Sequence, residues 1–320
     1  MIVDFRCRPP FDETIHHLFS KQLMDSYEIY HDYKTDPSQR SLSMEDFFAE
    51  MNEAGISKGV VTGRRTVGGL KEIKGQENRQ NDAVKRLLET YPDRFIGAFG
   101  IDPTDGEQVL EYIQEYVIEG PFTSVLVEPG ICKIPMSLDN ERLLPIYDYL
   151  EAHHIPMMLA MGELNYRAMR HMRPEALDNV LEMFNDLTTI IYHGGWPYVN
   201  EVMWIAFNRP NLYISPDYTM LYTWPGYESY ITAANYILTD RIIFGSGYPY
   251  WSMIKAKEYY LSKLRPEVVD KVMGINALRA LNLPVPDDAP AVNPFFKRES
   301  IPKEISDLNL HKIYEKRKWD

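Results

Sequence analysis

Cysteine is scarce in this chain: only two occur among 320 residues, Cys7 and Cys132. They give neither a disulfide framework nor a repeated metal-ligand spacing, so we predict no disulfide-stabilised fold and no structural zinc. Long apolar runs are also missing. No stretch approaches about eighteen uninterrupted apolar residues, and no basic-then-apolar leader precedes the first β-like run, so we expect neither a membrane span nor a signal peptide. The sequence predicts a cytoplasmic protein.

Positive charge is in short supply as well. The chain has 34 Lys and Arg against 46 Asp and Glu, a formal net charge of -12, and no basic stripe. Such a surface repels phosphate backbones and anionic membranes, so we expect no nucleic-acid partner and no membrane partner. A local cationic pocket could still attract a small anion. The remaining composition, 45% hydrophobic and 25% charged, is typical of a globular protein.

Short β-rich runs alternate with segments of helical periodicity along most of the chain. The eight runs span residues 2–7, 58–63, 94–101, 124–129, 155–161, 188–194, 211–215 and 241–247, and the helix-like segments include 43–55, 77–93, 106–120, 140–154 and 175–187. Eight strand-then-helix units predict an α/β fold, the parallel (β/α)8 TIM barrel. A doubly wound sheet is the alternative, but it usually has a glycine-rich phosphate turn where this chain has Pro9 and Pro10.

Two segments fall outside the barrel repeat. Residues 9–42 form a long insertion after the first strand, rich in Tyr, His and Asp, which could cover the barrel mouth or be an ordinary surface insertion. We expect the barrel to span residues 1–283. Residues 284–320 are then a C-terminal extension, proline-rich at its start, that packs on the barrel or on a second subunit of a homodimer.

The stretch DFRCRPP places two arginines, Arg6 and Arg8, two positions apart in the first strand. Strand alternation predicts that both face the barrel axis together with Asp4, while Val3, Phe5 and Cys7 face the helices. Two interpretations stand. The arginines could be neutralised by inward carboxylates in a closed salt-bridge network. Alternatively they bind an anionic group of a small carboxylated substrate, because an arginine fork matches a carboxylate.

Reactive groups of such barrels lie at the carboxyl ends of the strands. Of the eight histidines only His193 ends a strand, and we predict that it transfers protons, although barrel hydrogen bonds could equally hold it. Glu128 ends the fourth strand and could be a general base, orient His193 or neutralise an arginine. Asp217 is a weaker acid-base candidate, since an Asp after Pro is most often structural.

The other candidates would contact the substrate. Arg64, after the second strand, could extend the anion site or be one of a solvated loop pair. Trp196, Tyr218 and Tyr248 belong to the aromatic residues that crowd the loops after strands six to eight. Aromatic side chains there suit a flat or ring-shaped substrate, although simple packing of long loops is an equal explanation for each.

Four motifs carry a family resemblance: the opening D-x-R-x-R, YHGGWP at strand six, IIFGSGYP at strand eight and the closing MGINALRALNL. Over residues 1–283 the chain resembles the amidohydrolase-related TIM-barrel proteins, which include zinc-dependent decarboxylases and hydrolases. The resemblance implies a barrel enzyme with its site at the strand ends.

The same resemblance implies metal ligands that this chain lacks. Such families bind metal through an H-x-H pair on strand one, a histidine on strand five or six and an aspartate on strand eight. Here Arg6 and Arg8 stand at the pair, Ala160 stands on strand five and Gly247 replaces the aspartate, which leaves only His193. A guanidinium has no available lone pair and cannot ligate zinc, so we predict no metal and no other cofactor.

These observations predict a metal-independent hydrolase or lyase of the amidohydrolase-related type. Its reaction would be lactone or amide hydrolysis, decarboxylation or hydration of a small carboxylated substrate, which could be cyclic, held by Arg6 and Arg8, with His193 as acid and base. Two alternatives stay open at the level of sequence. One is a catalytically inactive barrel that binds a small anion, and the other is a zinc hydrolase with shifted ligands.

Overall fold

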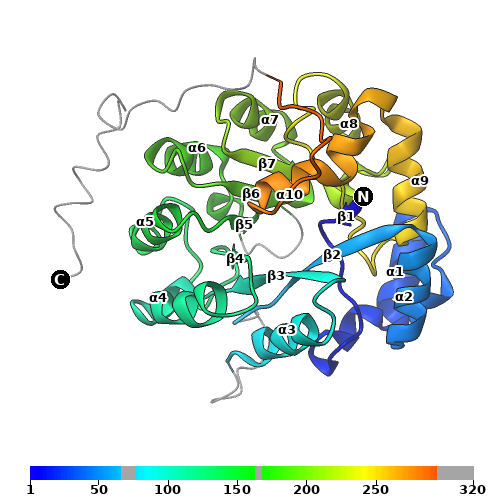
Figure 1. The fold of residues 1–320 in the computed structure, drawn as a ribbon, viewed down its shortest axis with the longest axis horizontal. Coiled ribbons are helices and arrows are strands. Elements are labelled where there is room, and N and C mark those ends of the chain that lie inside the picture. The colour runs from blue at the N-terminus through cyan, green and yellow to red at the C-terminus, as the bar shows by residue number, and fades with distance from the viewer. Residues whose placement is uncertain (66–76, 163–167, 294–320) are drawn as a thin grey trace.

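The computed structural model of the chain describes residues 1–65, 77–162 and 168–293 (Figure 1). One parallel sheet holds seven strands in sequence order. They are β1 (Ile2–Asp4), β2 (Ile56–Thr62), β3 (Phe95–Gly100), β4 (Ser124–Val127), β5 (Met157–Ala160), β6 (Thr189–Tyr192) and β7 (Leu212–Ser215). Each coincides with a predicted β-rich run, and the TIM-barrel prediction is confirmed.

The eighth predicted run closes the ring without forming a regular strand. The Ile243 backbone N–H donates to the Ile214 carbonyl of β7 at 2.8 Å, and the Phe5 N–H donates to the Phe244 carbonyl at 3.0 Å. Asp4 reinforces this closure, because its carboxylate accepts from the backbone N–H and the hydroxyl of Ser246 at 2.8 and 2.6 Å. Segment 241–248 therefore joins β7 to the chain just after β1.

Helices surround the sheet on the outside, as Figure 1 shows for α3 to α8. They are α1 (Lys21–His31), α2 (Met44–Glu53), α3 (Arg79–Thr90), α4 (Gln108–Ile113), α5 (Leu144–Ala152), α6 (Pro174–Met183), α7 (Val199–Asn208), α8 (Tyr227–Asn235), α9 (Met253–Lys263) and α10 (Asn276–Ala280). The five predicted helical segments correspond to α2 to α6. At the start of α2, Ser43 accepts a hydrogen bond from the Asp46 backbone N–H, which caps the helix.

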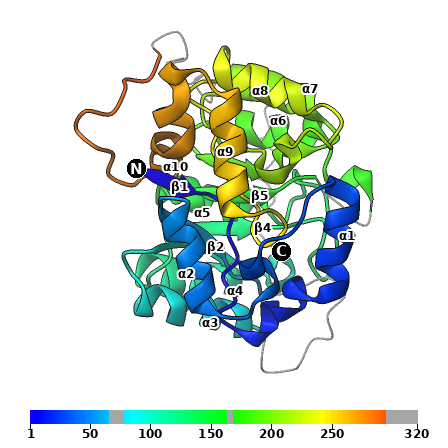
Figure 2. The same cartoon turned by 90° about the vertical axis from the view of Figure 1, so that its right-hand side faces the viewer.

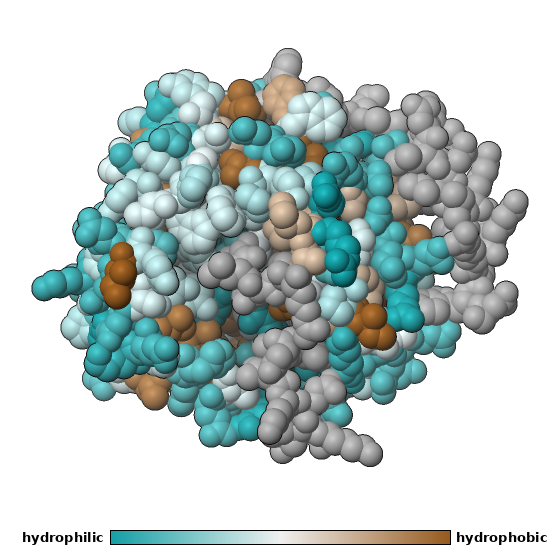
Figure 3. Space-filling model, turned by 180° about the vertical axis from the view of Figure 1, so that it is seen from behind, coloured by the Kyte–Doolittle hydropathy of each residue, from teal (hydrophilic) through white to brown (hydrophobic). Residues whose placement is uncertain are grey.

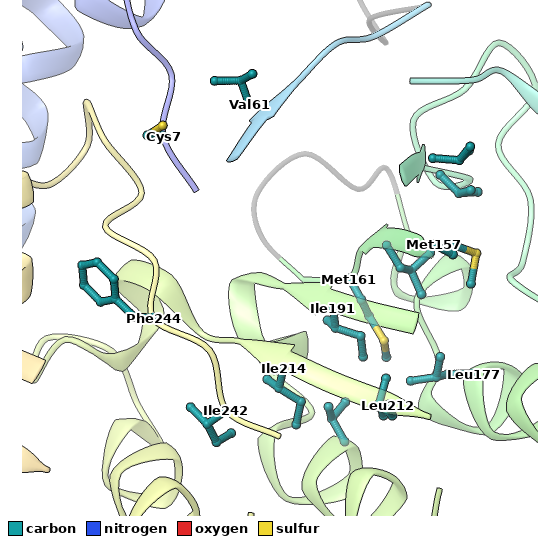
Figure 4. Close-up of a cluster of buried hydrophobic side chains, with 14 of the residues drawn as sticks. Cys7, Val61, Met157, Met161, Leu177, Ile191, Leu212, Ile214, Ile242 and Phe244 are labelled. Carbon is teal, nitrogen blue, oxygen red and sulfur yellow. The ribbon is translucent and has the colours of Figure 1, made fainter. Parts of the chain in front are cut away.

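Strand residues alternate between two buried clusters. Val125, Met157 and Ile191 belong to the larger cluster, which also contains helix residues and fills the space between strands and helices (Figure 4). Their neighbours Leu126 and Met158 belong to a smaller cluster inside the ring. A barrel interior is filled in this way by side chains from successive strands.

The predicted orientation of strand one is wrong in part. Val3 and Phe5 lie in the inner cluster, whereas Cys7 lies in the outer one. The register to β2 shifts between Ile2 and Val3, and the chain bends at residues 5 and 6, so strict alternation does not extend through the motif. Arg6 nevertheless reaches the interior, where it contacts β2 and β6.

The insertion 9–42 covers loops at the strand carboxyl ends. From α1, the ring of Tyr27 stacks on Tyr250 with 4.6 Å between ring centroids. Further along, the Gln39 side-chain amide donates to the Pro249 carbonyl at 2.7 Å. Figure 2 shows α1 standing away from α2 on this side of the molecule. The insertion is thus part of the wall around the barrel mouth.

The described helices do not combine the length and apolar character needed to cross a bilayer. The face of the molecule seen in Figure 3 is mostly hydrophilic, with apolar residues in small groups. The expected packing of the extension 284–320 stays a prediction, since residues 294–320 lie outside the described part of the chain.

A buried carboxylate ties the insertion to the barrel wall. Glu50 of α2 accepts hydrogen bonds from the Ser252 hydroxyl at 2.8 Å and the Met253 backbone N–H at 2.7 Å, at the start of α9, and from the Ser38 hydroxyl of the insertion. Burial raises the pKa of Glu50. One side chain thus satisfies donors from two separate elements.

We predict that Glu50→Ala lowers the free energy of unfolding by about 1–3 kcal/mol, because it leaves buried donors without an acceptor. Urea denaturation followed by circular dichroism measures the effect. Glu53→Ala, at an exposed position of the same helix, is the control and changes stability by less than about 0.5 kcal/mol. Equal effects of the two substitutions would show that Glu50 does not hold these elements together.

Candidate active site

Arg6 is a fully buried cation with few partners. Its Nη1 donates to the Thr62 hydroxyl at 2.8 Å, and its guanidinium lies 4.2 Å from the ring centroid of Tyr192. The Nε and Nη2 atoms are buried and have no hydrogen-bond partner among the residues that the structure describes. Burial, followed by the nearby charge of Arg8, lowers the pKa of Arg6 to about 10, so that it is still protonated at neutral pH.

Arg8 lies beside Arg6 and is also short of partners. It is 8% exposed, and its guanidinium lies 5.0 Å from the ring centroid of Tyr250. Its Nη1 has no hydrogen-bond partner within the described part of the chain. Arg8 and Thr62 also line a cavity of about 30 Å³ between the barrel rim and the insertion. This volume is room for a water-sized group next to the guanidinium.

Three buried acids near the two arginines are bonded to other groups. The Asp4 carboxylate accepts from Ser246, Glu128 pairs with Arg64, and Asp217 contacts His193. Within residues 1–65, 77–162 and 168–293 no carboxylate lies within ion-pair distance of either Arg6 or Arg8. A closed salt-bridge network, the structural interpretation of these arginines, is therefore not what the described residues form.

Glu128 and Arg64 form a bidentate ion pair. Arg64 Nε and Nη2 donate to the two carboxylate oxygens at 2.6 and 2.8 Å, and the Tyr192 hydroxyl donates to the same carboxylate. Although burial raises the pKa of Glu128, Arg64 and Tyr192 outweigh it and lower this pKa to about 2. A carboxylate so stabilised is a poor general base. Because the Tyr192 ring lies against Arg6, the pair instead fixes the surface on which the guanidinium rests.

His193 and Asp217 form a second buried pair, at the ends of β6 and β7. The imidazole Nδ1 lies 2.9 Å from an Asp217 oxygen, and the His193 backbone N–H donates to the same carboxylate at 3.1 Å. Both residues have positive φ, 61° and 43°, in the left-handed region that costs energy for residues other than glycine. Burial raises the pKa of Asp217, although the charge of Arg6 and the His193 backbone N–H act in the opposite direction.

Aromatic rings line the mouth next to this pair. The Tyr218 ring is buried, with its centroid 5.1 Å from that of His193, 5.8 Å from Tyr250 and 5.7 Å from Trp224. Trp196 lies further out. Its ring contacts Trp224 edge to face, and its indole N–H donates to the Pro225 carbonyl at 3.1 Å.

Tyr248 does not join this group. Its hydroxyl donates to the Ser38 carbonyl at 2.8 Å, and its ring packs against Phe19 and Phe47 in the outer cluster. The structure gives no support for Tyr248 as a substrate-binding residue. Arg64 likewise donates through both Nε and Nη2 to Glu128. The prediction that Arg64 extends the anion site is therefore not supported either.

Two residues of the site were missed at the level of sequence, Thr62 and Tyr192. Tyr192 carried a usable signal, because it directly precedes His193 and shares the inward face of β6 with Ile190. Thr62 had no such signal, because its contact with Arg6 depends on where the first strand bends.

The Amidohydrolase family model matches residues 14–283 of the chain. The chain belongs to the amidohydrolase family. Accordingly it is an enzyme of the hydrolase or lyase type. No curated protein matches it.

Solved structures share the fold. A TIM-barrel protein of unknown function from Bordetella bronchiseptica is 31% identical over 88% of this chain and 98% of its own, with a TM-score of 0.78. A 2,6-dihydroxybenzoate decarboxylase from Rhizobium is 16% identical over 88% and 98%, with a TM-score of 0.63. A 4-oxalomesaconate hydratase from Rhodopseudomonas palustris is 18% identical over 88% and 96%, with a TM-score of 0.57.

The residues present at the mouth do not fit the divalent ion that the family resemblance implies. In the described part of the chain no three His, Cys, Asp or Glu side chains gather as a metal site would require. His193 and Asp217 are bonded to each other, and the positions beside them carry the cations Arg6 and Arg8. Guanidinium groups cannot ligate a metal and repel one electrostatically.

We predict that Glu128→Gln destabilises the protein by about 3 kcal/mol at neutral pH, since it leaves the half-buried Arg64 without its counter-charge. The pKa of Glu128 falls from an ordinary 4.5 to about 2 on folding. Its stabilisation is therefore present above pH 4.5 and is lost as the pH falls toward 2.

Chemical denaturation of wild type and variant between pH 7 and pH 3 measures both effects. The difference in stability between the two proteins should shrink toward the acid end. Glu89→Gln, at an exposed position of α3, serves as control and should change neither stability nor its pH dependence. A difference that stays constant down to pH 3 would contradict the assignment.

Proposed function

We propose that this protein is a metal-independent enzyme that binds a small carboxylated, cyclic substrate between Arg6 and Arg8 and transfers a proton through His193. One observation carries the proposal. Beside a buried His–Asp pair, three nitrogen atoms of two buried guanidinium groups have no hydrogen-bond partner in the described ranges: Arg6 Nε and Nη2 and Arg8 Nη1. Buried donors without partners cost free energy, and an anionic ligand would satisfy them.

Charge supports a carboxylate as that ligand. Neither arginine has a carboxylate of the described chain within ion-pair distance, so a substrate carboxylate would supply the missing negative charge. Arginine and carboxylate match geometrically, and charge-assisted hydrogen bonds are about twice as strong as neutral ones. Arg64 and Glu128 support the site indirectly, because their pair fixes Tyr192 beneath Arg6.

The aromatic residues favour a ring-shaped substrate. Tyr218 and Tyr250 flank the region between His193 and Arg8, and Trp196 lies at the rim. The decarboxylase that shares this fold is named for a carboxylated ring, and the hydratase for a small carboxylic acid. Decarboxylation and hydration both need charge held in place and a proton moved, which are the two things these residues offer.

His193 would move the proton in this scheme. Asp217 accepts from Nδ1, which keeps the lone pair of the neutral imidazole on Nε2 and orients the ring. In hydrolysis or hydration this nitrogen would take a proton from water. In decarboxylation it would first be protonated by solvent and would then give that proton to the carbon that loses carbon dioxide. Asp217 stabilises the imidazolium form in either case.

We predict that Arg6→Met and Arg8→Met each weaken binding of 2,6-dihydroxybenzoate about 10- to 100-fold, because each removes charge-assisted hydrogen bonds of about 1.5–3 kcal/mol. Isothermal titration calorimetry gives the affinities, and circular dichroism establishes that the variants are folded. Arg142→Met, at an exposed position, is the control. Wild-type affinity in both folded variants would end the proposal.

A second prediction concerns the metal. Purified protein should contain far less than one zinc or manganese per chain by elemental analysis. Dialysis against a chelator should leave both its carboxylate affinity and any turnover unchanged, because the arginines take the electrostatic role of the ion. Loss of activity on chelation, with recovery on adding zinc, would favour a zinc hydrolase with shifted ligands.

A further inference from the structure

Gly247 occupies a position that disfavours any side chain. Its φ is +74°, in the left-handed region, and its backbone N–H donates to the Arg6 backbone carbonyl at 2.9 Å. A Cβ atom added here would lie 2.5 Å from Cδ1 and 3.4 Å from Cε1 of Tyr218. Contacts under about 3 Å do not occur between carbon atoms, so any side chain at position 247 has to displace the Tyr218 ring.

The ring that would be displaced, Tyr218, is part of the candidate active site. Tyr218 is 2% exposed, and its hydroxyl is buried with no hydrogen-bond partner among the described residues. Buried tyrosine hydroxyls usually find a partner, because an unsatisfied one keeps its full desolvation cost. The ring stands beside His193 and Tyr250, and Tyr250 lies against Arg8. The unsatisfied hydroxyl therefore belongs to the same side of the barrel as the unsatisfied guanidinium nitrogens.

We infer that Tyr218 is the third residue, after Arg6 and Arg8, that donates a hydrogen bond to the substrate carboxylate, and that Gly247 is the positioning residue that leaves room for its ring. This inference rests on the proposed function. Arg6 Nε and Nη2, Arg8 Nη1 and the Tyr218 hydroxyl together make four donors, and an ionised carboxylate has about four lone-pair sites to accept them. The Tyr218 hydroxyl should therefore favour binding of a ring that carries a carboxylate over binding of the same ring without it.

Two ligands and three variants test this. The probes are 2,6-dihydroxybenzoate and resorcinol, which is the same ring without the carboxylate. The variants are Tyr218→Phe, Gly247→Asn and the double variant. Asn is chosen because it tolerates the left-handed region better than most residues, so that displacement of the ring dominates its effect.

Tyr218→Phe should weaken binding of the carboxylate about tenfold or more, as expected for a hydrogen bond to a charged group, and leave resorcinol affinity within about twofold. Gly247→Asn should do the same through displacement of the ring. The double variant should bind no more weakly than the weaker single variant, because a ring without its hydroxyl has no hydrogen bond left to lose.

Wild-type carboxylate affinity in Tyr218→Phe, or an equal loss of both probes, would overturn the inference, and so would additive losses in the double variant. If Gly247→Asn does not fold, Tyr218→Phe decides alone. Failure of the proposed function would give a different result. The wild-type protein would then bind no carboxylate, or Arg6→Met would bind it as tightly as the wild type does. If instead Arg6→Met loses binding and Tyr218→Phe keeps it in full, only the inference about Tyr218 is overturned.

Discussion

A guanidinium buried without a carboxylate partner is the constraint on which this site depends. Moving an isolated charge out of water costs several kcal/mol even after the protein relaxes. Arg6 is 0% exposed, and in return its Nη1 donates one hydrogen bond to the Thr62 hydroxyl and its guanidinium lies against the Tyr192 ring. Burial lowers the pKa of Arg6 because the few contacts that it makes do not fully replace water around its charge. A folded protein retains such a group only where the rest of the structure stabilises it or where a ligand completes it.

The barrel supplies that stabilisation through a chain of contacts. Arg64 fixes Glu128, Glu128 accepts from the Tyr192 hydroxyl, and the Tyr192 ring lies against Arg6. On the other side, Asp4 clamps the first strand to the eighth segment through Ser246. None of these residues needs to touch a substrate. Their effect is to hold a cation at the strand ends, where a barrel enzyme performs its chemistry.

Much of this could be predicted from sequence because it depends on local periodicity. The β-rich runs and the helices between them follow from apolar spacing, and the strand-end rule selected His193 from eight histidines. The orientation of Val3 and Phe5 could not be predicted, since it depends on a register shift and a bend in the first strand.

The pairing of Arg64 with Glu128 could not be predicted from sequence either. The two residues are 64 positions apart, and the sequence did not show which acid pairs with which arginine. Tyr248 illustrates the opposite error. It stands next to the site in sequence, but its ring turns into the outer cluster, where the Ser38 carbonyl accepts from its hydroxyl. Sequence proximity to a strand end does not determine which way a loop residue points.

The most direct test of the central claim is a crystal structure of the protein grown with 2,6-dihydroxybenzoate, with diffraction also recorded at the zinc absorption edge. We predict carboxylate density within hydrogen-bond distance of Arg6 and Arg8 and no anomalous peak at the barrel mouth. An anomalous peak next to His193, or a carboxylate bound away from both arginines, would contradict the claim that paired guanidinium groups do here what a metal ion does in related barrels.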